Sequence, residues 1–133
     1  MKNLVFVYGS LKNGLWNHSV LGDSPFVGEA VTIDRFLMTT VGFPYMIPKN
    51  LLTEDHYDES YLKNVKGEVY EVNENTQKSL DILEGVAHDH YKQEEITVFI
   101  NGEIKTVLAY IPCDPNVQYY RIVDTNKDDI YDF

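Results

Sequence analysis

Apolar residues along this chain occur in short runs and alternating stretches, a pattern typical of strands. The first run, residues 4–8, is β-branched and aromatic without polar interruptions, and it stops at Gly9-Ser10, which indicates a buried strand entering a tight turn. Asn101-Gly102 is a strong hairpin signal between two later strands. The other strands predicted from alternation or apolar runs cover residues 26–33, 36–41, 65–72, 91–100 and 105–111.

The remaining segments are weaker in pattern. Residues 43–48 are apolar but contain two prolines, which favours an extended edge or a loop, and residues 49–64 are polar and acidic, as in a surface insertion. A short helix is predicted over residues 77–84, with capping residues before it, Gly85 after it, and Leu80, Ile82 and Leu83 facing inward. We therefore expect an α+β, mainly β fold: a small mixed or antiparallel β-barrel of about six strands with short flanking helices.

Length and composition place the chain among ordinary globular proteins. Its 133 residues predict a single domain over 1–133, with 44% apolar and 24% charged residues. No apolar run reaches the roughly 20 residues that span a bilayer, and the first residues do not resemble a signal peptide. Cys113 is the only cysteine, so no intramolecular disulfide can form and a cytoplasmic location is expected.

The formal charge of −10 argues against nucleic acid or an anionic membrane as a partner, because such binding requires clustered Lys and Arg. The acidic residues, concentrated in 54–59 and 124–132, are interpreted as solvated surface. An anionic small molecule would have to be held by local hydrogen-bond donors.

The turn after the first strand is the first candidate for such donors. Gly9 permits a tight turn and Ser10 can bond locally, so consecutive backbone N–H groups could face an anion or a developing oxyanion. An ordinary strand-to-loop turn explains the same residues, and the pattern alone leaves both interpretations open.

Glu84 is the second candidate, because it stands at the predicted C-terminal end of the helix. The helix dipole disfavours a carboxylate there, and with partial burial beside Leu80 the same field would make Glu84 a stronger base. A solvated helix-end glutamate is the alternative.

Other chemistries find little support. His88-Asp89-His90 would place two imidazoles on one face of a strand, but no further ligands have matching spacing, so no metal is expected. No phosphate-binding loop or nucleophile elbow surrounds Ser10. Tyr8, Tyr91 and Tyr110 stand near the two candidate features, although each could also be a core residue.

Two motifs together resemble the γ-glutamyl cyclotransferase-like family, and most closely its γ-glutamylamine cyclotransferase branch. They are Val-Phe-Val-Tyr-Gly-Ser-Leu-Lys-x-Gly over residues 5–14 and Leu-Asp-x-Leu-Glu-Gly over residues 80–85. The resemblance extends from Leu4 to about Ile111 and implies a small β-barrel with flanking helices. Supporting matches are Asn17-His18, Gly42-Phe43-Pro44, residues 65–70, Tyr91 and Ala109-Tyr110.

The resemblance also implies a reaction, the release of 5-oxoproline from a γ-glutamyl amide or amine. The loop formed by Tyr8, Gly9, Ser10 and Leu11 would hold the glutamyl group, and Glu84 would take a proton from its α-ammonium. The substrate supplies the nucleophile, so no metal or organic cofactor is expected.

Tyr91 and Tyr110 are assigned to substrate binding on the same resemblance. Family members commonly carry Arg where this chain has Gln93, and they often carry an aromatic residue where this chain has Pro112 after Ile111. These two departures concern the preference for a leaving group. Two other functions stay open: a non-catalytic binding or regulatory domain of this fold, and an acidic protein acting through its Asp-rich segments.

Overall fold

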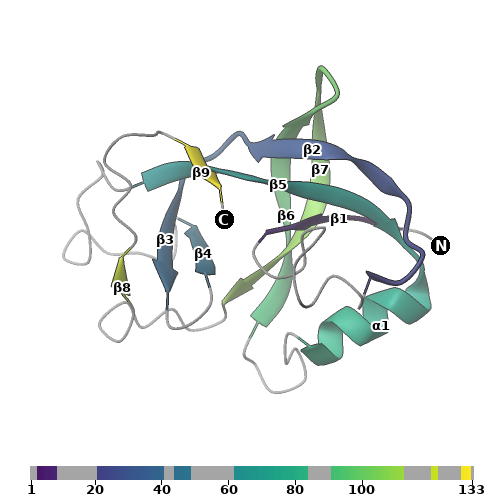
Figure 1. Ribbon diagram of the computed structural model, residues 1–133. Coiled ribbons are helices and arrows are strands. Elements are labelled where there is room, and N and C mark those ends of the chain that lie inside the picture. The colour runs from purple at the N-terminus through teal and green to yellow at the C-terminus, as the bar shows by residue number, and fades with distance from the viewer. Residues whose placement is uncertain are drawn as a thin grey trace.

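The computed structural model describes residues 3–8, 21–40, 44–48, 62–83, 91–112, 121–122 and 130–132. These residues form nine strands and one helix (Figure 1). In chain order the elements are β1 Asn3–Val7, β2 Phe26–Thr32, β3 Phe36–Thr40, β4 Pro44–Pro48, β5 Leu62–Val72, α1 Glu74–Leu83, β6 Tyr91–Ile100, β7 Glu103–Pro112, β8 Arg121–Ile122 and β9 Ile130–Asp132.

Five of the strands form a closed barrel. They are hydrogen-bonded in the order β1-β7-β6-β2-β5, and β5 pairs back with β1 from Asn3↔Val72 to Val7↔Glu68. The β1–β7 pair is parallel and the other four barrel pairs are antiparallel. The mixed, closed barrel agrees with the prediction from the sequence.

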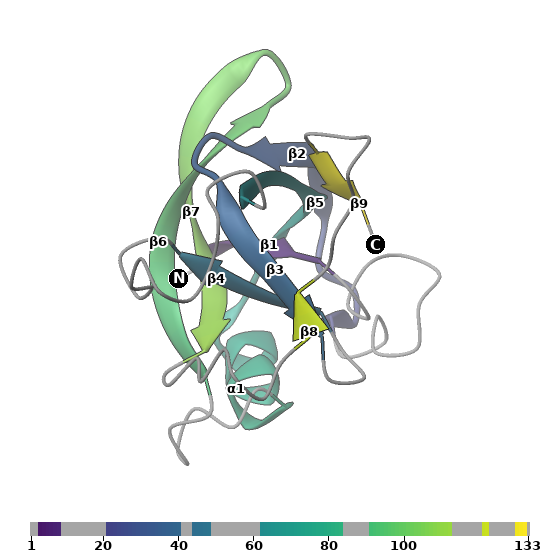
Figure 2. The ribbon, with the colours of Figure 1, turned by 90° about the vertical axis from the view of Figure 1, so that its left-hand side faces the viewer.

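A smaller group of strands extends the sheet beyond β5. Leu62 at the start of β5 pairs with Leu37 of β3, and β3 pairs in turn with β4, so β5 belongs both to the barrel and to this extension. Figures 1 and 2 show β3, β4 and β8 together beside the barrel, with β9 along β5.

The extension corrects one expectation from the sequence, decides between two alternatives for β4, and adds two short strands. The surface insertion was expected to reach residue 64, but β5 already begins at Leu62, where Leu62 is buried against β3. β4 is a regular strand, in the edge position that its two prolines favour. The strands β8 and β9 were not predicted, because two or three residues are too short for a periodic pattern.

The barrel encloses an apolar core, here called the inner cluster. Alternate residues of the barrel strands point inward, and Phe36, Met38 and Met46 from β3 and β4 join them. Members from the five barrel strands include Phe6, Ala30, Val65, Val69, Val98 and Ala109.

The helix covers the outer side of the barrel (Figure 1). Asn73 caps it, because its Oδ1 accepts a bond of 2.9 Å from the Thr76 N–H, and this starts α1 three residues earlier than predicted. Leu80 packs into a second apolar group, the outer cluster. The outer cluster consists of Val5, Val7, Leu21, Tyr70, Val72, Leu80 and Tyr110.

The prediction that Ile82 and Leu83 face inward was wrong. Ile82 is 81% exposed and Leu83 is 41% exposed, since the helix meets the barrel along a narrow stripe that only Leu80 enters fully. With ten residues, α1 is also too short to cross a membrane, and it is the only helix among the described residues.

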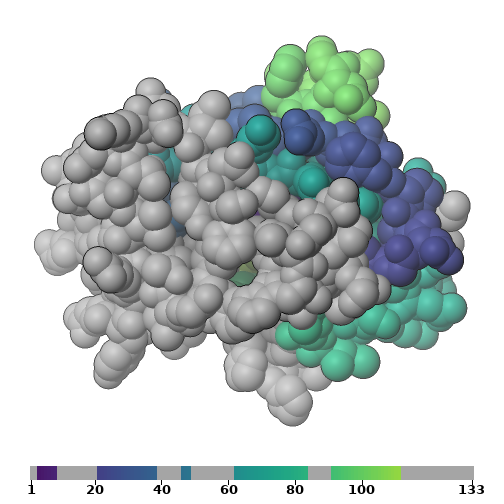
Figure 3. Space-filling model, in the orientation of Figure 1, coloured from purple at the N-terminus to yellow at the C-terminus, as the bar shows by residue number. Residues whose placement is uncertain are grey.

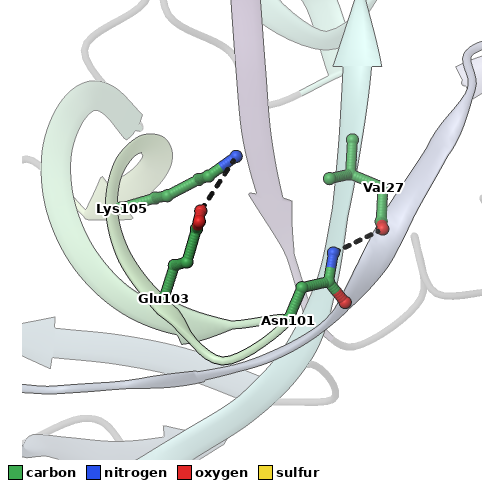
Figure 4. A network of polar contacts seen from close by, with 4 residues as sticks. All are labelled: Val27, Asn101, Glu103 and Lys105. Carbon is green, nitrogen blue, oxygen red and sulfur yellow. Dashed lines mark hydrogen bonds and ion pairs between the residues drawn. The ribbon is translucent and has the colours of Figure 1, made fainter.

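The β6–β7 hairpin turns at Asn101-Gly102, as predicted, with both residues at positive φ (51° and 78°). The Asn101 Nδ2 donates a bond of 3.2 Å to the Val27 carbonyl of β2, and Lys105 lies 3.9 Å from Glu103 beside it (Figure 4). The hairpin end projects above the neighbouring surface in Figure 3. The turn therefore both fixes the hairpin register and ties the hairpin to β2.

Candidate active site

The structure describes three of the residues assigned to the site from the sequence. Tyr8 follows β1 directly, Tyr91 is the first residue of β6, and Tyr110 lies near the end of β7. The predicted base Glu84, and Gly9, Ser10 and Leu11 of the predicted binding loop, lie outside the described residues. The same holds for Cys113 and for His88-Asp89-His90.

Tyr8 fixes the end of β1 at the inner side of the barrel. Its ring packs against the inner cluster, with its centroid 6.2 Å from that of Phe6. Its hydroxyl accepts a bond of 3.0 Å from the Met46 N–H of β4 and donates a longer one, 3.5 Å, to the Tyr110 carbonyl of β7. The chain is thus held by two other strands just before it enters the predicted binding loop.

Tyr110 lies with its ring on the opposite side of the sheet, in the outer cluster. Its hydroxyl donates a bond of 2.7 Å to Asp81 Oδ1 and accepts one of 3.0 Å from Gln77 Nε2, both from α1. Burial and the neighbouring Asp81 carboxylate both raise the pKa of the Tyr110 phenol well above its usual value near 10. Tyr110 is therefore a neutral hydrogen-bond donor to the helix.

Asp81 is the point where α1 meets both strands of the hairpin. In addition to the Tyr110 hydroxyl, Gln93 Nε2 of β6 donates a bond of 2.6 Å to Asp81 Oδ1. Gln77, one helical turn earlier, also accepts a bond of 3.4 Å from Asn3 at the start of β1. We call Gln77, Asp81, Gln93 and Tyr110 the polar cluster.

Tyr91 is half-buried and packs against the outer cluster. It pairs with Pro112 in the hairpin, two positions from the Gln93–Tyr110 pair. The structure thus places Tyr91 and Tyr110 on the helix side of the sheet and Tyr8 on the inner side. Tyr8 and Tyr110 nevertheless meet through one hydrogen bond.

Nothing in the local sequence pattern marks Gln77 or Asp81 as a partner of a tyrosine, and Gln93 stands out only as a departure from the family. Two patterns could have found them. Gln77 and Asp81 are four apart and flank Leu80, so they share its helix face. Counting outward from the two-residue turn pairs Gln93 with Tyr110.

A metal site finds no support in the part of the chain that the structure describes. No three His, Cys, Asp or Glu side chains of those residues come together as a set of ligands. Instead, hydrogen bonds from neutral donors, several of them to the Asp81 carboxylate, join α1 to β1 and to the hairpin.

Comparison with known proteins identifies the class to which this fold and arrangement belong. Residues 5–129 match the family described as gamma-glutamyl cyclotransferase, AIG2-like, and the chain belongs to this family. The match covers both motifs on which the resemblance was based, together with Tyr91 and Tyr110.

Individual relatives agree with the family. A Methanocaldococcus jannaschii protein, named as a candidate gamma-glutamylcyclotransferase, is 34% identical over 111 residues, covering 81% of this chain and 83% of the relative. The Bos taurus gamma-glutamylaminecyclotransferase is 36% identical over 105 residues, covering 74% of this chain but 57% of the bovine protein.

The fold is likewise that of solved family structures. The crystal structure of an AIG2-like protein from Mus musculus has a TM-score of 0.70 at 24% identity, over 92% of this chain and 86% of the mouse chain. This similarity establishes the shared fold.

Proposed function

We propose that this protein is a γ-glutamyl cyclotransferase that releases 5-oxoproline from a γ-glutamyl amine or γ-glutamyl amino acid. The α-amine of the glutamyl group attacks its own γ-carbonyl, a carbon–nitrogen bond closes the five-membered ring, and the bond to the leaving amine breaks. Glu84 takes the first proton from the α-ammonium before the attack, and the same nitrogen loses a second proton as the ring closes. Both protons end on the departing amine, which leaves in its ammonium form.

For this reaction the protein must position the glutamyl group and provide one base and hydrogen-bond donors for the carbonyl oxygen. The nucleophile belongs to the substrate, so holding the glutamyl group folded supplies much of the rate. Backbone N–H groups of the loop from Tyr8 to Leu11 would hold the carbonyl oxygen as negative charge develops on it. An activated serine or cysteine of the protein is not needed.

The observation that carries the proposal is the family match over residues 5–129, which contains both the loop motif and the Glu84 motif. The hydrogen bonds through Tyr110 support it, because they connect Tyr8, next to the loop, with Asp81, three residues before Glu84. A γ-glutamylamine is the preferred donor class, since the bovine relative is named for that substrate.

The direct test is a set of donors incubated with the protein, with 5-oxoproline measured by mass spectrometry. The set contains γ-glutamyl-ε-lysine, γ-glutamyl dipeptides and glutathione, and each reaction has a control without protein. The α-glutamyl isomer of one dipeptide is a matched control, because its second amino acid is bound to the α-carboxyl and closing the ring at the γ-carboxyl cannot release free 5-oxoproline. We expect 5-oxoproline from at least one γ-glutamyl donor and none from the α-isomer.

A non-catalytic binding domain of the same fold predicts a different outcome. γ-Glutamyl compounds would then raise the melting temperature without any 5-oxoproline appearing, and this result would contradict the enzyme proposal. An acidic interaction protein predicts that replacing Asp124, Asp128 and Asp129 by asparagine abolishes function, whereas we expect these substitutions, which keep β9 and its pairing with β5, to leave turnover largely intact.

A further inference from the structure

We propose that Tyr110 and Asp81 act as a positioning pair, which sets the end of α1 relative to the end of β1 and so aligns the base with the substrate loop. The inference rests on the proposed function and extends it to two residues that would act without touching the substrate. It is an alternative to the substrate-binding role that the family resemblance implies for Tyr110.

Tyr110 is suited to this role because it is bonded on both sides of the sheet. Its backbone carbonyl accepts a bond from the Tyr8 hydroxyl on the inner side, and its own hydroxyl donates to Asp81 on the helix side. The single proton of the phenol is used in the bond to Asp81, so the hydroxyl has no second proton to donate to a ligand. One residue thus links the two segments that lead into the predicted site.

Both links lie close to the predicted catalytic groups along the chain. Gly9 follows Tyr8, and consecutive Cα atoms are about 3.8 Å apart, so the loop cannot begin far from the Tyr8 anchor. Glu84 follows Asp81 by three residues, which limits their Cα separation to about 10 Å. A displacement of about 1 Å in such a geometry can cost roughly 10²-fold in rate.

Apolar packing alone fixes the end of α1 poorly. Leu80 is the only buried residue of the helix, and Ile82 and Leu83, which follow Asp81, are 81% and 41% exposed. A helix held by one apolar side chain can rotate or tilt about that contact. The bonds from Tyr110 and Gln93 to Asp81, next to Leu80, oppose this motion.

The test measures kcat and KM for Tyr110→Phe, Asp81→Ala, Asp81→Asn and the double variant Tyr110→Phe/Asp81→Ala. We expect kcat to fall by about 10- to 100-fold in Tyr110→Phe and Asp81→Ala, with KM within about threefold, because the base is displaced while the loop still binds substrate. Asp81→Asn keeps an oxygen that can accept the Tyr110 bond and should recover much of the loss. The double variant should lose little more than the worse single variant, since both remove the same bond.

Amide hydrogen exchange of residues 74–83 supplies a readout that does not depend on turnover. Exchange should be faster in Tyr110→Phe and Asp81→Ala than in wild type. Two matched controls should keep wild-type kcat. Tyr70→Phe removes a part-buried hydroxyl that donates a bond of 3.1 Å to Glu68 of its own strand, and Glu74→Gln removes a carboxylate from the first turn of α1.

The outcomes separate this inference from the function on which it rests. Wild-type kcat in Tyr110→Phe and Asp81→Ala, unchanged exchange in α1, or losses that multiply in the double variant would each overturn the positioning pair alone. A wild-type protein that forms no 5-oxoproline from any donor would overturn the proposed function and the positioning pair together.

Discussion

The inside of the barrel and the contact between the barrel and α1 are built on different principles. The inner cluster is apolar throughout its described members and draws on every barrel strand. The helix contact has one buried leucine and is completed by hydrogen bonds of the polar cluster. Apolar packing sets how stable a fold is, whereas hydrogen bonds with defined directions set how one element is oriented on another.

One sheet provides both the apolar core and the oriented contact with α1, because its strands present different residues on their two faces. In β1, Phe6 points to the inner cluster while Val5 and Val7 point to the outer cluster. In β7, Ala109 faces inward and Tyr110 faces the helix. Alternation along a strand therefore places stabilising residues on one side and positioning residues on the other.

The largest effect should come from breaking the inner cluster. Phe6 is 1% exposed, and Phe6→Ala should lower the free energy of unfolding by about 3–5 kcal/mol, from lost burial and the remaining cavity. Urea denaturation followed by circular dichroism measures the change. Ile104→Ala, on a side chain that is 65% exposed, is the control and should cost less than about 1 kcal/mol. Equal losses in both variants would show that the inner cluster is not the main source of stability.

A smaller loss is expected where β1 and β5 approach each other. A Cβ at Gly67 would lie 2.6 Å from the Phe6 ring and would also meet the Val7 carbonyl. Gly67→Ala should therefore cost about 1–3 kcal/mol, because the backbone of β1 must move. Because Val7 precedes Tyr8, we also expect turnover to fall. An alanine variant as stable as wild type in urea would contradict the close approach.

Alkaline pH acts on the polar cluster through Tyr110, whereas the residues of the inner cluster named above carry no titratable group. The Tyr110 pKa is raised, so the folded state favours the neutral phenol, while the unfolded phenol ionises near pH 10. The stabilisation is fully present below pH 10 and is lost as the pH rises further toward the folded pKa. The melting temperature of Tyr110→Phe should fall less between pH 9.5 and 11 than that of wild type, as measured by scanning calorimetry. Identical falls would mean that Tyr110 is not protected from ionisation.

The smallest effect is expected on the exposed side of α1. Ile82 is 81% exposed, and Ile82→Ser should change the free energy of unfolding by no more than about 0.5 kcal/mol. Thermal melts of the two proteins suffice as the measurement. A loss above 2 kcal/mol would show that Ile82 is buried, as the sequence analysis first expected.

Local patterns predicted the larger part of the fold. The six main strands and the Asn101-Gly102 turn could be inferred because each has a period or a turn residue of its own. The strands β8 and β9 could not, since their pairing with β3 and β5 depends on distant segments. The prediction of the inward face of α1 was right for Leu80 and wrong for Ile82 and Leu83, which fit an apolar stripe in the sequence but remain exposed in the structure.

The candidate site was harder to predict from the sequence than the fold. Tyr8 and Tyr110 were noticed for their positions, but their shared hydrogen bond connects residues 102 apart in the chain. The role of Asp81 depends on the angle at which the helix lies on the barrel, which no local pattern encodes. Gln93 could be placed opposite Tyr110 by counting from the turn, whereas its bond to the helix could not be inferred.

The central claim is that Glu84 is the base of a cyclotransferase, and Glu84→Gln tests it most directly. With the donor that gives the most 5-oxoproline, we expect this variant to turn over roughly 10²- to 10⁴-fold more slowly, because a general base contributes about that much. Its melting temperature should stay near that of wild type. Glu95→Gln, which removes an exposed carboxylate from β6, should keep wild-type turnover. Near-normal 5-oxoproline formation by Glu84→Gln would contradict the account.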